Sequence, residues 1–188
     1  MSLLLSDNKN WGGNRMGILS GNPKEEPLHY GEVFSAWTYL HNLKGTIAQY
    51  QTLQNHAGDK ELKALLDDLV KNVGKEQVKQ VEDLLKVNGI GLPPTPPERP
   101  SAAIESIPVG AKVNDQEIAN IIAANISAGL VACSTAIGQC VREDVAAMFA
   151  QFHATKVQYG LRVLRLNKEK GWLIPPPLHL KTPELVNV

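Results

Sequence analysis

Apolar residues recur at intervals of three and four along four stretches of this chain, which is the spacing of amphipathic helices. The stretches cover about residues 30–57, 59–88, 114–141 and 143–170. The first stretch is defined by Val33, Ala36, Trp37, Leu40, Leu43, Ile47, Tyr50 and Leu53. Helices of this size are each roughly 40 Å long. The pattern therefore predicts an all-α bundle of four helices of similar length.

Capping signals mark several of the predicted helix ends. Asp59 can cap the start of the second helix, and Gly89 can end it, because glycine tolerates the left-handed conformation of a helix C-terminus. Asn114 and Glu117 stand three residues apart at the start of the third helix, which is the spacing of a capping box. These signals predict that the second and third helices are separate elements.

The boundary between the third and fourth helices carries no glycine or proline. A single helix from Asn114 to Lys170 would be roughly 85 Å long, which is too long for a compact domain of this size. We therefore expect a tight reversal near Val141 and Arg142, with acidic residues in the first turn of the helix that follows.

A proline-rich connector, residues 89–113, separates the two pairs of helices. Fully extended, it could span up to about 80 Å, so it can cross the whole bundle. A long link at this point suits a ferritin-like four-helix bundle, in which the first and fourth helices run parallel. We divide the chain into an extended arm (1–28), the bundle (29–172) and a proline-rich tail (173–188). We expect the tail to lie along the bundle or against a partner subunit.

The charge balance narrows the classes of partner. Lys and Arg together number 19, as do Asp and Glu, so the formal net charge is zero and no basic excess is available for nucleic acid or a membrane surface. Cys133 and Cys140 are seven residues apart on one predicted helix, too far apart for a disulfide. We expect a cytoplasmic protein with no nucleic-acid or membrane partner.

Three motifs carry a resemblance to a known family. They are Gly31–Trp37 (GEVFSAW), Asn88–Pro93 (NGIGLP) and Leu164–Pro177 (LRLNKEKGWLIPPP). Over about residues 28–185 the chain resembles one copy of a ferritin-like family of unknown function from spore-forming bacteria, related to spore coat protein F. The resemblance implies the bundle fold and an association with the spore coat. It implies no particular reaction.

The usual di-iron site of ferritin-like bundles is not encoded. Such a site takes a Glu from each of two helices and a Glu-x-x-His pair from each of the other two. The one Glu-x-x-His here is Glu26 to His29, which precedes the first helix and contains a proline. Iron-storage or oxidase chemistry of the usual kind is therefore disfavoured.

Five polar residues interrupt or flank the apolar faces near the middle of the predicted bundle. They are His41, Glu76, Gln80, His153 and Lys156. On a wheel of 100° per residue, four of them fall within the apolar faces of the second and fourth helices, and His41 lies on the flank of the first. The crossover topology places all five at similar heights, so they form the candidate binding site.

Two interpretations of this polar layer remain open. In one it is structural, with Glu76 paired to Lys156 or His153, because buried charges need partners. In the other, Glu76, His153 and His41 bind a small ligand or a metal such as Fe, Mn or Zn. Gly129, facing inward from the third helix, would leave room for either arrangement.

Four aromatic side chains at helical spacing, Phe34, Trp37, Phe149 and Phe152, are expected in the core. Cys133 is expected to behave as a small buried hydrophobe.

Our leading hypothesis is a non-enzymatic bundle with a structural or interaction role, spore- or coat-associated, without a cofactor or catalytic residues. We expect a homodimer or other homo-oligomer that self-associates through its bundle faces and tail. The alternative is a metal-binding or redox bundle with a non-standard site. A third hypothesis is a helical adaptor for a coat protein or another cytoplasmic partner.

Overall fold

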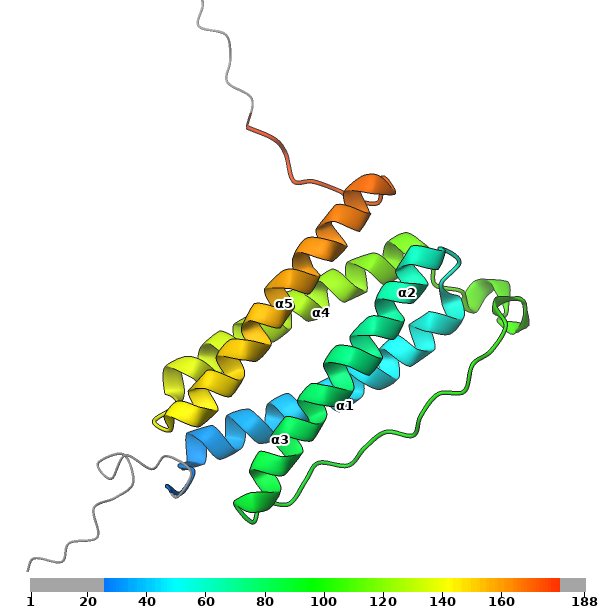
Figure 1. The fold of residues 1–188 in the computed structure, drawn as a ribbon. Helices are drawn as coiled ribbons and strands as arrows, with labels where there is room; N and C mark the ends of the chain where they lie inside the picture. Colours follow the sequence, from blue (N-terminus) through cyan, green and yellow to red (C-terminus); the bar gives the residue numbers. More distant parts are fainter. Residues whose placement is uncertain (1–25, 180–188) are drawn as a thin grey trace, which may run out of the picture.

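The computed structural model describes residues 26–179, in which helices are joined without any β-strand (Figure 1). The long helices are α1 (Tyr30–His56), α2 (Lys60–Asp68), α3 (Lys75–Val87), α4 (Asp115–Gln139) and α5 (Glu143–Glu169). A π-helical segment, η3 (Leu69–Gly74), joins α2 to α3 without a break. Two short 3-10 turns, η4 (Ile104–Ser106) and η5 (Val109–Ala111), lie in the connector. Counting α2, η3 and α3 as one rod, the predicted four-helix architecture is confirmed.

The connector produces the predicted crossover. It leaves the end of α3 and runs back along the bundle before α4 begins (Figure 1). The carboxylate of Asp115, in the first turn of α4, accepts hydrogen bonds from the backbone N–H groups of Gly58 (2.8 Å) and Asp59 (3.0 Å). The start of α4 is therefore attached to the α1–α2 turn. Consequently α1 runs parallel to α5 and α3 runs parallel to α4, which is the ferritin-like arrangement.

The predicted helix ends are confirmed. The Asn114 side chain accepts from the Glu117 N–H (2.9 Å), and the Glu117 carboxylate accepts from the Asn114 N–H (2.8 Å). Asp59 accepts from two N–H groups in the first turn of α2. Gly89, just beyond α3, has a φ of 71°, the left-handed value that disfavours other residues.

The reversal between α4 and α5 is organised by a buried polar network that the sequence does not reveal. The Glu32 carboxylate, on α1, accepts from the backbone N–H groups of Val141 (2.9 Å) and Arg142 (2.8 Å). The Arg142 guanidinium is buried as well, and it donates to Asp144 (2.7 and 3.0 Å) and to the Glu26 carbonyl (2.9 Å). These contacts fix the turn without a glycine or proline.

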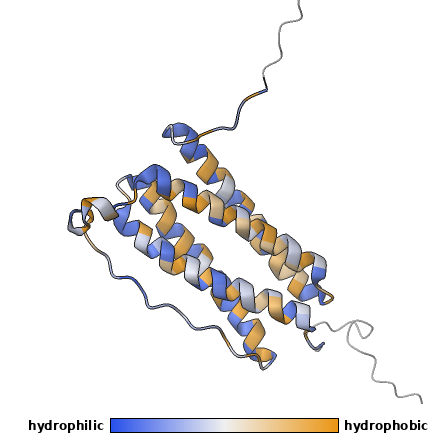
Figure 2. Cartoon of the chain, turned by 180° about the vertical axis from the view of Figure 1, so that it is seen from behind, coloured by the Kyte–Doolittle hydropathy of each residue, from blue (hydrophilic) through white to orange (hydrophobic). Residues whose placement is uncertain are grey.

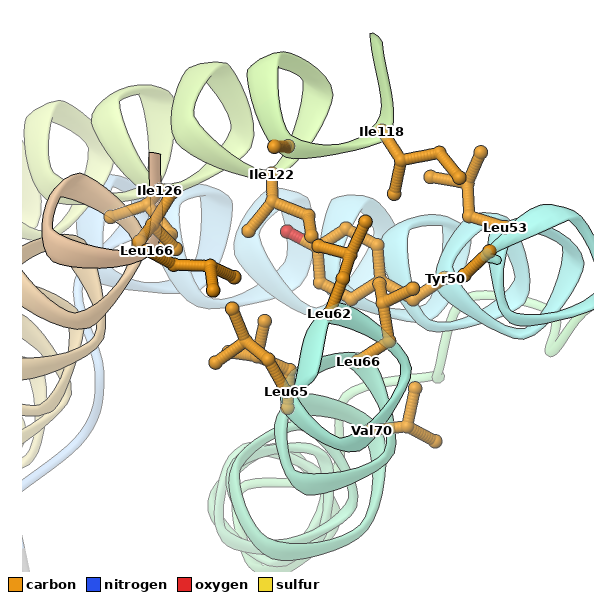
Figure 3. Packing of buried hydrophobic residues seen from close by; sticks show 14 residues of the cluster. Tyr50, Leu53, Leu62, Leu65, Leu66, Val70, Ile118, Ile122, Ile126 and Leu166 are labelled. Carbon is orange, nitrogen blue, oxygen red and sulfur yellow. The ribbon is translucent and has the colours of Figure 1, made fainter. Parts of the chain in front are cut away.

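The core contains two apolar clusters, one toward each end of the bundle. At the α1–α2 end, Leu62, Leu66 and Ile122 are fully buried among side chains from four helices (Figure 3). At the other end, Phe149 and Phe152 pack against the Tyr39 ring. Each fully buried side chain of this size stabilises the fold by about 1.5–3 kcal/mol. The predicted core positions of Phe149, Phe152 and Cys133 are confirmed.

Two predicted core residues lie on the surface instead. Phe34 is 71% exposed and Trp37 is 36% exposed, because Ala36 and Leu40 occupy the buried face of α1. The Trp37 indole donates a hydrogen bond to the Gly91 carbonyl (2.9 Å). Trp37 therefore helps to attach the connector to α1.

The described part of the tail extends away from the helices (Figure 1). Trp172 is partly buried, and its carbonyl accepts a hydrogen bond from the Gln116 side chain (3.1 Å). Beyond it, Ile174 and Leu178 are 76% and 73% exposed. The expectation that the tail lies along the bundle is therefore wrong for these residues, and contact with a partner stays a prediction. The predicted arm, apart from residues 26–28, and residues 180–188 lie outside the described range.

α4 is unusual in composition. No charged residue occurs between Ile118 and Val141. The stretch Val109–Gln139 is long and apolar enough, by length and composition alone, to cross a membrane, a test that core helices of soluble bundles also pass. In its most apolar window just 22% of the residues are buried within the bundle. α4 thus presents an uncharged side that the other residues of the range 26–179 do not cover.

Candidate functional site

A cavity of about 840 Å³ opens between α1 and α4 and extends inward to η3 and α5. Its apolar lining includes Leu43, Ile47, Leu69, Val73 and Ile126. Its polar lining includes Thr38, Asn42, Gln49, Asn125, Thr135 and Gln139. The volume lies within the range typical of small-molecule sites, which are mostly apolar with a few polar groups.

Lys156 reaches this cavity from α5. Its side chain passes directly over Gly129 of α4, where an added Cβ would lie 2.8 Å from the lysine Cε. The ammonium Nζ lies 5.4 Å from the centroid of the Tyr39 ring. Burial lowers the pKa of Lys156. Within residues 26–179 this ammonium makes no hydrogen bond or ion pair.

The groups around Lys156 are neutral. The Tyr39 hydroxyl donates to the Gln77 side chain (2.7 Å), and burial raises its pKa well above the ordinary value. Burial likewise raises the pKa of the Cys133 thiol and raises that of Tyr50 to about 12. No Asp or Glu from the described part of the chain lines the cavity. The site therefore holds one cation without an anion beside it.

An ion-pair cluster links α5 to the second helix at the inner end of the cavity. Asp68 accepts from the Tyr159 hydroxyl (2.8 Å), from Arg162 (2.6 Å) and from Asn72 (2.7 Å). The hydrogen bond from Arg162, followed by that from Asn72, holds the pKa of Asp68 below its ordinary value. Asp68 is thus fully engaged and does not face Lys156 as a partner.

The structure brings together two of the five predicted site residues. Lys156 and His41 both line the cavity, and His41 stacks on Trp37 near the mouth with ring centroids 5.6 Å apart. Glu76, Gln80 and His153 do not line it. The inward position predicted for Gly129 is confirmed, since the lysine passes against it.

The predicted pairing of Glu76 with Lys156 or His153 is wrong. Glu76 is exposed and accepts a hydrogen bond from Gln80 (3.0 Å). The cause is the π-helical segment η3, which takes an extra residue into its turn and rotates everything after it. Gln77, Val81 and Leu85 occupy the buried face of α3. Glu76 and Gln80 each precede one of these buried residues in the sequence, so they lie about 100° around the helix from the buried face.

The predicted metal ligands are not assembled. Across residues 26–179, no group of three or more His, Cys, Asp or Glu side chains lies in an arrangement that could hold a metal ion. His29 of the Glu26 to His29 pair is the N-cap of α1: its Nδ1 accepts from the Gly31 N–H (2.9 Å). The Glu32 carboxylate in turn accepts from the His29 N–H (3.1 Å), which completes a capping box.

Comparison with protein families gives a match over most of the chain. Residues 16–185 match a family of proteins of unknown function, DUF3231. The chain belongs to this family. A relative from Bacillus subtilis (strain 168), the uncharacterized protein YvdQ, is 51% identical over 166 residues, which cover 88% of this chain and 97% of YvdQ.

A solved relative carries a description of its biological context. A crystal structure from Bacillus halodurans C-125, named a "putative spore coat protein", is 55% identical with a TM-score of 0.83, and the match covers 85% of this chain and 100% of that one. The resemblance found in the sequence, a family of unknown function with a spore-coat link, is confirmed.

Two more distant structures show the fold alone. A conserved hypothetical protein from Mycobacterium tuberculosis has a TM-score of 0.59 at 13% identity, covering 72% of this chain and 96% of that one. A two-domain protein from Anabaena variabilis ATCC 29413, with DJ-1/ThiJ/PfpI-like and ferritin-like domains, has a TM-score of 0.54 at 14% identity. That match covers 97% of this chain and 48% of the Anabaena protein. The ferritin-like architecture is thereby supported.

Proposed function

We propose that this protein is a non-enzymatic, spore-associated structural component that self-associates through the outer face of the α4–α5 hairpin. The observation that carries the proposal is a pair of exposed, uncharged stripes, one on each helix, which we call the outer face. The spore association is supported by the relative from Bacillus halodurans, which is named a "putative spore coat protein" and is 55% identical over 85% of this chain and 100% of its own.

The stripe on α4 follows the heptad spacing of three and four residues. It consists of Asn120, Ala124, Ser127, Val131, Ser134 and Gly138. All of these residues are exposed, and Val131 is 67% exposed. Alternating steps of four and three keep the stripe on one side of the helix, away from the buried residues such as Ile122 and Ile126.

The stripe on α5 has the same period. It consists of Ala147, Ala150, Ala154, Val157, Leu161 and Leu164. Leu161 is 56% exposed, and Val157 and Leu164 are each 40% exposed. Hydrophobic residues recur along both helices (Figure 2). An exposed apolar seam such as the one on α5, next to an uncharged stripe of small and polar residues on α4, is typical of an interaction surface rather than of a solvated face.

A second copy of the chain fits this face. A repeat of 3.5 residues is the period with which helices pack against other helices by knobs into holes. The two helices together present a strip about 37 Å long and about 20 Å wide, or roughly 700–800 Å², and a standard interface buries about 800 Å² per partner. The absence of charge from both stripes removes repulsion between two identical surfaces. A two-fold dimer follows.

The cavity chemistry is consistent with a non-enzymatic role. The buried Cys133 thiol has a raised pKa, which disfavours the thiolate needed for nucleophilic attack. The described residues place no carboxylate or second base beside Lys156, so no nucleophile and base are paired there.

Light scattering during size-exclusion chromatography tests the self-association. We expect the full chain to elute as a dimer and Val131→Lys to elute as a folded monomer. Val87→Lys is the matched control, because Val87 is 83% exposed at the end of α3, away from the outer face. A wild-type monomer at the highest soluble concentration would overturn the self-association.

A fluorescent fusion in the sporulating host tests the location. We expect the signal to concentrate at the developing spore. A signal spread evenly through the cell during sporulation would contradict the spore association.

A further inference from the structure

We propose that the cavity between α1 and α4 binds a small organic carboxylate with an apolar body, and that Lys156 is the charge partner of its carboxylate. This inference does not depend on self-association, because the cavity opens on the α1 side of α4 and the outer face lies on the α4–α5 side.

Lys156 has no anionic partner among the described residues. A buried cation is normally paired, because removing it from water is costly. Lys44, which is buried, is paired with the Glu82 carboxylate (2.8 Å) and donates to the Pro93 carbonyl (3.0 Å), whereas Lys156 is half-buried. Among the residues described, Lys156 receives no such partner, apart from the face of Tyr39. An anion from outside the chain would complete the pairing.

Two glycines shape the space around Lys156. Gly129 leaves room for the Lys156 side chain to cross α4, and any larger residue there would displace it. Gly74 belongs to the π-helical segment that forms part of the wall, where an added Cβ would lie 2.8 Å from Ile47. Single π-helical turns inside α-helices often occur at functional sites. Both glycines and the extra residue of η3 are therefore placed where they shape this cavity.

The lining of the cavity favours one class of ligand. Leu43, Ile47, Leu69, Val73 and Ile126 provide an apolar lining that favours a hydrocarbon body over a fully polar ion such as phosphate. Among the described residues that line the cavity, Lys156 is the one Lys or Arg, which matches a single carboxylate. Two hydrogen bonds between lining residues join α1 to α4 at this cavity. Asn125 donates to the Gln49 side chain (2.9 Å), and Ser35 donates to the Gln139 side chain (3.3 Å).

Isothermal titration of the full chain with octanoate tests the proposal. We expect one site per chain, with 1-octanol and acetate each binding at least ten times more weakly, because one lacks the charge and the other lacks the body. We expect Lys156→Met to reduce octanoate affinity at least tenfold. Arg165→Gln, which removes an exposed cation elsewhere on α5, should leave the affinity unchanged.

Thermal unfolding without ligand separates a binding lysine from a structural one. Since Lys156 is a half-buried cation with no anion beside it among residues 26–179, Lys156→Met should raise the melting temperature by about 2–4 °C. A structural lysine would give a lower melting temperature instead.

Three results would overturn the inference: no octanoate binding by the wild type, equal binding by Lys156→Met, or a loss of stability in that variant. Val131→Lys should still bind octanoate as the wild type does. Failure of self-association would therefore be seen separately from failure of ligand binding.

Discussion

Three buried charged residues of this bundle are paired within the chain. Glu32, Arg142 and Lys44 each have charged or hydrogen-bonding partners at 2.7–3.0 Å. The half-buried Lys156 differs from them, since it has no ion pair with any of the described residues. The sequence predicted that Lys156 would interrupt an apolar face, because helical spacing reveals which side of a helix a residue occupies. The sequence could not predict that Glu76 would point away from Lys156 into solvent, because the orientation of Glu76 depends on the π-helical segment η3 of another helix.

The ion pair between Arg142 and Asp144 predicts an acid-dependent loss of stability. The hydrogen bond from Arg142 holds the pKa of Asp144 below its ordinary value of 3.8. The folded state therefore favours the ionised carboxylate, and this contribution is fully present above pH 3.8 and lost as the pH falls through the lowered pKa. Urea unfolding of Asp144→Asn should show a smaller decrease in stability over this acidic window than the wild type shows. An identical pH profile for both proteins would contradict the prediction.

At the scale of elements, local sequence signals located the helix ends well, but they did not fix the rotation of α3. Asp59, Gly89 and Asn114 act through capping, within a few residues of the chain. The reversal near Val141 was expected from helix length alone, and Glu32 of α1 holds it in place. The rotation of α3 depends on η3, where tertiary packing selects an i to i+5 hydrogen-bonding pattern. A regular period of 3.6 residues continued through Gly74 therefore assigned the wrong residues to the core.

Deleting one residue inside η3 tests this explanation. Removal of Asn72, which is exposed, should convert η3 to a regular α-helical turn and leave Val81 and Leu85 facing the core. Removal of Lys79, from the regular helix α3, should rotate Leu85 by about 100° relative to the residues before it. We expect the Lys79 deletion to cost more stability in urea unfolding. An equal or greater cost for the Asn72 deletion would contradict our account of the phase change.

At the scale of the whole molecule, the length and composition of the connector predicted the crossover, and the family comparison agrees with the resulting fold. The outer face was harder to predict. Sequence periodicity alone cannot distinguish an exposed apolar stripe from a buried one, since both repeat at helical spacing. Exposure had to be measured on the folded chain before α4 and α5 could be assigned an uncovered side.

Self-association of the folded chain predicts a melting temperature that depends on protein concentration. A dimer that forms only between folded copies is stabilised by mass action, so the melting temperature of the wild type should rise as the protein is concentrated. That of Val131→Lys should stay constant. Differential scanning calorimetry over a wide concentration range measures both. A wild-type melting temperature that does not change would count against a dimer of folded subunits.

The attachments of the connector predict that the folded chain tolerates cleavage within it. Side chains of α1 hold it at several points, including Asn55, which donates to the Pro100 carbonyl (3.0 Å) and accepts from the Ala102 N–H (3.0 Å). Asp115 ties the two hairpins together independently, through the α1–α2 turn. A protease that cut between these points would leave two fragments already docked by their shared core. The peptide bonds of the connector are thus needed to assemble the bundle more than to hold it together afterwards.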